Sequence, residues 1–217
     1  MDAAKVFNAM YEKRAFLARV FLTLFVQLCI TYYVMNRKTN PDANIIVLFI
    51  ALIVIVFILS AVPLPESAKL LLFTIFSYLF GLVFSKFKED PDYNSESINV
   101  AIMGAASVFL SMMVVGIALL AGGIRLGYKF GLLLFFSLLA LIIARLVFFV
   151  TAAGSGARSK MSDIRKAFSA VGIVIFAFYV LYTTNRILQK NYMDNYISAS
   201  LSYYLDFINL FSSSYEH

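Results

Sequence analysis

The sequence predicts an all-α membrane protein, a bundle of seven transmembrane helices that forms a single domain over residues 1–217. Three observations lead to this fold class. The 217 residues are 62% hydrophobic and only 14% charged, whereas about 25% of the residues of a soluble domain are charged. The mean hydropathy is +0.86. Seven separate stretches are apolar over the length, or nearly the length, that a helix needs to cross about 30 Å of hydrocarbon.

Short segments rich in Pro, Gly, Asn or charged residues separate the seven stretches, which cover residues 17–35, 45–62, 68–85, 98–121, 130–150, 167–188 and 196–211. The separators at 36–41, 63–66, 86–92, 122–125, 154–158 and 190–191 are typical of turns. Because these separators are short, we expect consecutive helices to be antiparallel. The fourth stretch carries small residues from Gly104 to Gly116 and on through Ala118 and Gly122, which predicts close packing against another helix.

The scarcity of cysteine and histidine excludes several classes of function. Cys29 is the one cysteine and His217 the one histidine, so the chain has neither an intrachain disulfide nor a zinc site built on cysteines. Histidine-dependent hydrolases, Ser-His proteases and haem proteins all need a histidine within the fold. An intramembrane aspartyl protease would need a second acid at membrane depth. We therefore expect no enzyme and no cofactor.

The basic residues border the apolar stretches, so the net charge of +6 indicates orientation in a lipid bilayer and not nucleic-acid binding. The two sets of loops carry nearly equal numbers of Lys and Arg. The bases around the start of the first stretch, Lys5, Lys13, Arg14 and Arg19, favour a cytoplasmic N-terminus.

The last stretch carries a polar face with an acid in its middle. Ser198, Ser202, Asp206, Asn209 and Ser213 follow one another at spacings of 4, 4, 3 and 4, which places them on one side of a helix. One interpretation is a cation or proton path, because carboxylate and hydroxyl oxygens suit Ca²⁺ and protons. Asp206 is then the candidate Ca²⁺ ligand. The other interpretation is a buried acid that an arginine neutralises to hold helices together.

Two arginines are candidate charge partners of Asp206. Arg145 lies inside the fifth stretch, five residues from its end, so its side chain can also extend to the membrane surface. Arg186 lies near the end of the sixth stretch, a position that suits an interfacial anchor.

Both ends of the chain resemble the Bax inhibitor-1 (transmembrane Bax inhibitor motif) family. The segments Phe178-Tyr-Val-Leu-Tyr-Thr-Thr-Asn-Arg-Ile187 and Tyr204-Leu-Asp-Phe-Ile-Asn-Leu-Phe211 are similar to the last two helices of that family. Arg14-Ala-Phe-Leu-Ala-Arg-Val-Phe21, with Gln27 and Thr31, resembles the first helix of the Golgi anti-apoptotic branch, which includes viral members. In the middle of the chain the resemblance rests on length and hydropathy.

The resemblance implies a central helix packed against six others and a Ca²⁺ leak from an internal store, in the Golgi or endoplasmic reticulum membrane, that responds to pH and suppresses cell death. In the family, two aspartates on the sixth and seventh helices share a proton. Asp206 matches the second, whereas Thr183 stands where the first is expected. The arginine that holds the first aspartate in some relatives is also absent, since no arginine lies between Arg37 and Arg125. We therefore expect Thr183, Asp206, Asn209 and Ser202 to line an ion path whose pH response is weakened.

A different function stays open beside the channel. The chain could suppress cell death as a non-conducting membrane scaffold that binds host apoptosis-regulating membrane proteins. Ca²⁺ flux in liposomes separates the two hypotheses.

Overall fold

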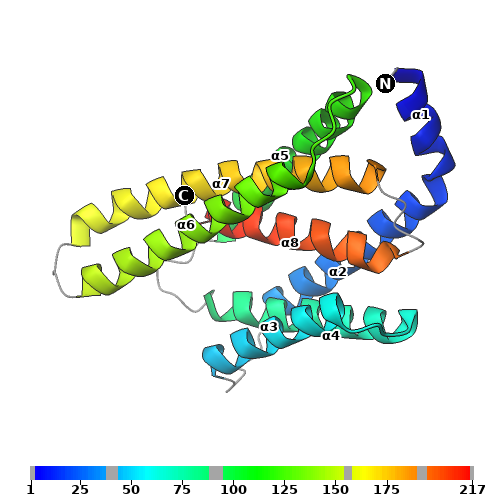
Figure 1. The fold of residues 1–217 in the computed structure, drawn as a ribbon. Helices are drawn as coiled ribbons and strands as arrows, with labels where there is room; N and C mark the ends of the chain where they lie inside the picture. Colours follow the sequence, from blue (N-terminus) through cyan, green and yellow to red (C-terminus); the bar gives the residue numbers. More distant parts are fainter. Residues whose placement is uncertain (1–2, 38–43, 88–94, 154–157, 190–194, 216–217) are drawn as a thin grey trace. The chain divides into compact units, whose positions relative to one another are not determined.

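The structure, a computed structural model, describes residues 3–37, 44–87, 95–153, 158–189 and 195–215 (Figure 1). Within these ranges every regular element is a helix. The helices in chain order are α1 (Ala3–Glu12), α2 (Arg14–Asn36), α3 (Ile45–Ala61), α4 (Glu66–Phe87), α5 (Ser95–Ala121), α6 (Tyr128–Ala153), α7 (Arg158–Gln189) and α8 (Tyr196–Tyr215).

Each of the seven predicted stretches coincides with one helix, from α2 to α8, and α1 is an additional helix that the sequence analysis did not predict. Among the described residues, five helices are long and apolar enough to cross a membrane, namely α2, α4, α5, α6 and α7. The all-α multi-pass architecture is therefore confirmed. The number of seven crossings stays a prediction, because α3 has only 17 residues and α8 carries serines, Asp206 and Asn209 among its apolar residues.

Two of the predicted turns lie within the described residues. Val62–Pro65 joins α3 to α4. At the end of α5, Gly123 has a φ of 84°, a left-handed conformation that glycine adopts without steric cost. The amide of Ile124 then donates to the Leu119 carbonyl oxygen at 2.8 Å, which closes the helix. The other separators, at 36–41, 86–92, 154–158 and 190–191, lie wholly or partly outside the described residues.

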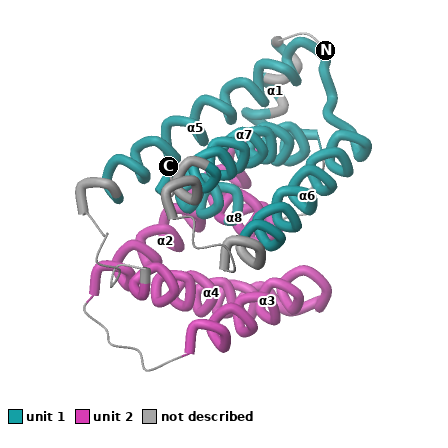
Figure 2. The backbone as a smooth tube through the Cα atoms, turned by 90° about the vertical axis from the view of Figure 1, so that its left-hand side faces the viewer, with its two compact units in different colours: residues 1–12, 95–191, 205–217 teal, residues 13–94, 192–204 magenta. Residues whose placement is uncertain are grey.

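The helices group into two compact units (Figure 2). Unit 1 comprises residues 1–12, 95–191 and 205–217, and in it α7 packs against α5 and α6 while α1 contacts α5. Unit 2 comprises residues 13–94 and 192–204, and in it α4 packs against α2 and α3. The continuous helix α8 contributes its first half to unit 2 and its second half to unit 1. The expectations of a single domain and of one central helix stay predictions.

Within unit 2, α2 and α4 run parallel. Gln27 Nε2 donates to Thr74 Oγ1 at 3.2 Å, and one turn further along both helices Thr31 Oγ1 donates to the Ser77 carbonyl oxygen at 3.0 Å. Two helices that advance together in this way need a return passage between them, and α3 supplies it. A parallel course of α2 and α4, with α3 between them in the chain, is expected if the three helices are successive membrane crossings.

The first half of α8 joins unit 2 through Tyr204. The side chain of Tyr204 is fully buried, and its hydroxyl lies 2.5 Å from Thr31 Oγ1. Its ring meets Phe73 and Phe76 edge-on at centroid distances of 5.4 and 5.8 Å, a favoured geometry for aromatic pairs. The buried phenol thus has both an apolar surround and a hydrogen-bond partner.

Small residues bring helices together at two places. In unit 1, a Cβ atom at Gly116 of α5 would lie 3.0 Å from the Leu181 carbonyl oxygen and 3.1 Å from Thr184 Cβ of α7. The predicted close packing of the small-residue face is therefore confirmed at Gly116. At Gly104 an added Cβ atom would meet no atom within 4 Å, so the prediction is not confirmed at that glycine.

Gly81→Ala is expected to destabilise the protein by about 1–3 kcal/mol, the usual cost of forcing an extra carbon into a packed interior. A Cβ atom at position 81 of α4 would lie 2.6 Å from Val34 Cβ and 2.8 Å from the Thr31 carbonyl oxygen of α2. The matched control is Gly104→Ala, which is expected to be neutral or stabilising by up to about 1 kcal/mol. Thermal unfolding in detergent measures both, and equal melting temperatures would contradict the close approach of α2 and α4.

Candidate functional site

The site begins with one hydrogen bond in unit 1, between α7 and α8. Thr183 Oγ1 donates to Asp206 Oδ2 at 2.8 Å. Both side chains are buried, with 8% of Thr183 and 7% of Asp206 exposed. The structure thus brings together the two residues that the sequence analysis placed in one constellation. Because the hydroxyl is the donor, the bond forms without a proton on the carboxylate.

Two adjacent threonines of α7 have different roles. The hydroxyl of Thr184 donates back to the Val180 carbonyl oxygen of its own helix at 2.8 Å, a common way for a buried threonine to satisfy its hydroxyl. Thr183 instead donates across to α8. Thr183 is therefore the member of this pair that can respond to the state of Asp206.

The polar face of α8 is buried unevenly. Asp206 and Ser213 are buried, whereas Ser198, Ser202 and Asn209 are half-buried. Ser202 Oγ donates to the Ser198 carbonyl oxygen within the same helix at 3.0 Å. The Ser213 carbonyl oxygen accepts a hydrogen bond from Ser169 Oγ of α7. The most deeply buried members of this polar face therefore lie in the half of α8 that belongs to unit 1.

The two candidate arginines lie on α6 and α7, and their pairing with Asp206 stays a prediction. Arg145 of α6 is half-buried, and its Nη2 donates to the Phe168 carbonyl oxygen of α7 at 3.3 Å. Arg186 is exposed in the last turn of α7, where a cation suits the negative end of the helix dipole. The side-chain hydrogen bond that Asp206 accepts comes from the hydroxyl of Thr183.

The oxygen atoms that meet at Asp206 are few. In the described ranges, no group of three or more His, Cys, Asp and Glu side chains could hold a metal ion. Ca²⁺ usually takes six to eight oxygen ligands, whereas one carboxylate and one hydroxyl meet here.

Asn185 is a buried polar residue whose role the sequence analysis missed. It is fully buried; its Nδ2 donates to the carbonyl oxygens of Ile124 at 3.2 Å and Gly116 at 3.5 Å, and its Oδ1 accepts from the Leu126 amide at 2.9 Å. Asn185 thus ties the connection between α5 and α6 to α7. The signal was present, since Asn185 follows Thr183 within the segment 178–187 that carries the family resemblance.

Asn185→Ala is expected to lower the free energy of unfolding by about 2–3 kcal/mol, because it leaves the Leu126 amide and two carbonyl oxygens without this partner in a buried place. The comparison variant is Asn44→Ala, which removes an exposed N-cap whose side chain accepts from the Ile46 amide and should cost about 1 kcal/mol. Denaturant unfolding in detergent measures both. Equal losses would mean that the Asn185 network contributes no more than an exposed cap.

Comparison with known proteins finds one matching family model and several relatives. The model of the family described as "Inhibitor of apoptosis-promoting Bax1" matches residues 13–213. The chain is 30% identical to Bax inhibitor 1 of Schizosaccharomyces pombe over 150 residues, 61% of this chain and 54% of that protein. It is 30% identical to Protein LIFEGUARD 1 of Arabidopsis thaliana over 112 residues, 50% of this chain and 45% of that protein. An uncharacterized protein of Campylobacter jejuni is 44% identical over 52 residues, 24% of this chain and 22% of that protein. The matches therefore span about half the length of these relatives, or less.

Proposed function

Because this chain belongs to the Bax inhibitor family, whose model covers residues 13–213, we propose that it is a Ca²⁺-permeable leak channel that regulates intracellular calcium and inhibits apoptosis. The observation that carries the proposal is the buried carboxylate of Asp206, which contacts a hydroxyl of α7. An ionisable group at membrane depth is costly to bury and is usually kept for ion or proton movement.

The chemistry of the site supports a permeant cation. Asp206 supplies negative charge, and its carboxylate oxygens are the hard ligands that Ca²⁺ prefers. Thr183 adds a hydroxyl oxygen. Asn209 and Ser202 lie about one helical turn to either side of Asp206 on the same face of α8. These oxygens line the proposed ion path, and Asp206 is the charged residue among them.

The cellular setting is part of the same proposal. We place the chain in the Golgi or endoplasmic reticulum membrane with the N-terminus in the cytoplasm, where the basic residues near the start of α2 would be held. Ca²⁺ and protons are its small partners, and host apoptosis-regulating membrane proteins are its protein partners. The proposal assigns it no cofactor and no catalysis.

Ca²⁺ flux in proteoliposomes tests the proposal. The purified chain is reconstituted with a Ca²⁺ indicator trapped inside, and external Ca²⁺ is added at neutral pH. We expect indicator fluorescence to rise well above that of protein-free liposomes and of liposomes holding an unrelated helical membrane protein at equal density. If the reconstituted chain gives no flux, while the same chain suppresses cell death when it is expressed in cells, the non-conducting scaffold replaces the channel as the function.

A further inference from the structure

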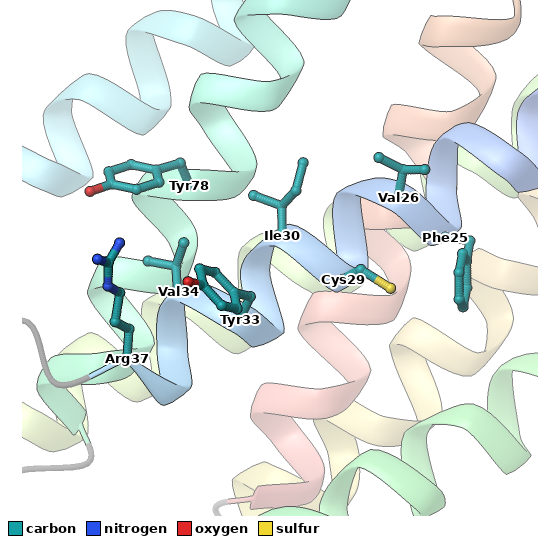
Figure 3. A pocket seen from close by; sticks show the side chains of 8 residues that line it. All are labelled: Phe25, Val26, Cys29, Ile30, Tyr33, Val34, Arg37 and Tyr78. Carbon is teal, nitrogen blue, oxygen red and sulfur yellow. The ribbon is translucent and has the colours of Figure 1, made fainter.

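A groove in unit 2 follows α2 (Figure 3). Its volume is about 410 Å³, within the range of about 300–1,000 Å³ of small-molecule sites. Its floor is apolar and comes from α2, where Phe25, Val26 and Cys29 are exposed and Ile30 is half-buried. Helix α2 is long and apolar enough to cross a membrane, and exposed apolar side chains on such a helix suit contact with lipid.

One end of the groove is polar and cationic. Arg37 directly follows the last residue of α2 as its C-cap, and its exposed side chain lines the groove. Tyr33 of α2 and Tyr78 of α4 line the same end (Figure 3). Arg37 is the one charged residue among the eight that line the groove. Arginine immediately beyond a membrane helix lies at the depth of lipid headgroups.

The length of the groove matches one leaflet. Phe25 and Arg37 stand twelve residues apart, which is about 18 Å along a helix. Half of a hydrocarbon core is about 15 Å deep. An acyl chain that starts beside Arg37 can therefore follow the groove as far as Phe25 within a single leaflet.

We propose that this groove binds an anionic phospholipid, with the lipid phosphate on the Arg37 guanidinium and one acyl chain along Ile30, Val26 and Phe25. The guanidinium fork matches the oxygens of a phosphate, and the two tyrosine hydroxyls offer hydrogen bonds at the same end. A zwitterionic lipid carries its own cation beside the phosphate and gains less from Arg37. The site thus selects by headgroup charge at one end and by an apolar chain at the other.

Native mass spectrometry of the purified full-length chain tests the site. The protein in detergent is equilibrated with equal amounts of dioleoylphosphatidylglycerol and dioleoylphosphatidylcholine, which have the same acyl chains. We expect the first bound lipid to be phosphatidylglycerol in about fivefold excess, the ratio expected from one basic residue at a membrane surface. Arg37→Gln should reduce the ratio to about one. The matched control Arg125→Gln removes an exposed arginine of unit 1 and should leave the ratio unchanged.

Cys29 provides an independent readout within the groove, since it is the one cysteine of the chain and is exposed. Alkylation of Cys29 by N-ethylmaleimide should slow when phosphatidylglycerol is added and respond less to phosphatidylcholine. Ile30→Trp, which fills the groove, should lower binding of both lipids. A ratio that persists in Arg37→Gln, or that falls equally in Arg125→Gln, would overturn the proposal. Protection of Cys29 by inorganic phosphate alone would also overturn it, because it would reveal an anion site that needs no acyl chain.

Discussion

We expect Ca²⁺ flux in proteoliposomes to fall at least about tenfold when Asp206→Asn replaces the buried carboxylate by an amide of nearly the same shape. A tenfold change corresponds to about 1.4 kcal/mol of barrier. That is less than the roughly 4 kcal/mol by which two unit charges attract at about 4 Å in a protein of intermediate effective dielectric. The loss of one formal charge beside a divalent ion is therefore large enough to produce the effect. Indicator fluorescence at neutral pH measures it.

Asp206→Asn removes the charge of the side chain and keeps its shape, so loss of charge can be separated from loss of structure. The side-chain carbonyl oxygen of an asparagine at position 206 can still accept the hydrogen bond from Thr183, so the contact between α7 and α8 survives. A melting temperature near that of the unchanged protein verifies this. The matched control is Glu12→Gln, the same chemical change at an exposed acid of α1, which should conduct normally. Normal flux through Asp206→Asn would make Asp206 a structural residue and remove it from the path.

Flux through Thr183→Asp is expected to vary about tenfold between about pH 6 and 8, and flux through the unchanged protein is expected to vary less, because it has one acid at this contact where the variant has two. The Thr183 hydroxyl does not titrate in this interval. Two carboxyls within hydrogen-bond distance, as at 183 and 206 in the variant, share a proton and titrate as a coupled pair. A group that titrates in the middle of two pH units changes its ionised fraction about tenfold across them. The same liposome assay over a pH series measures the response.

The control for this second prediction is Thr183→Asn, which has the shape of the aspartate but holds no titratable proton. It should stay as flat with pH as the unchanged protein. A steep response in the unchanged protein would place the sensor at another group. A flat response in Thr183→Asp, in a variant that remains folded, would mean that the helix contact seen at 2.8 Å is not where pH is sensed.

The apolar sequence was sufficient to predict the helices. In hydrocarbon every backbone amide and carbonyl must be hydrogen-bonded within the segment, so a long apolar stretch has little alternative to a helix. The helix over residues 98–121 was predicted from the charged segment before it and the glycines after it. Helix α5 ends at Ala121 because Gly123 takes a left-handed conformation. Helix α1 escaped prediction, because Ala3–Glu12 has only 10 residues and mixes charged with apolar side chains.

Periodicity along one helix also identified Asp206 as a buried acid, and the family resemblance named Thr183 as its neighbour. For Arg145 the sequence allowed either Asp206 or the membrane surface as its surroundings. In the structure Arg145 Nη2 donates to the Phe168 carbonyl oxygen, and the pairing with Asp206 stays a prediction. The network of Asn185 was not predicted at all.

The sequence by itself determined which segments are helices and which faces are polar, because helix formation and amphipathicity depend on residues a few positions apart. Only the tertiary structure decided which polar groups meet. Thr183 and Asp206 are 23 positions apart, and Asn185 and Ile124 are 61 apart. Contacts at such separations depend on how two helices cross and rotate against each other, and that is decided by the packing of side chains from both helices at once.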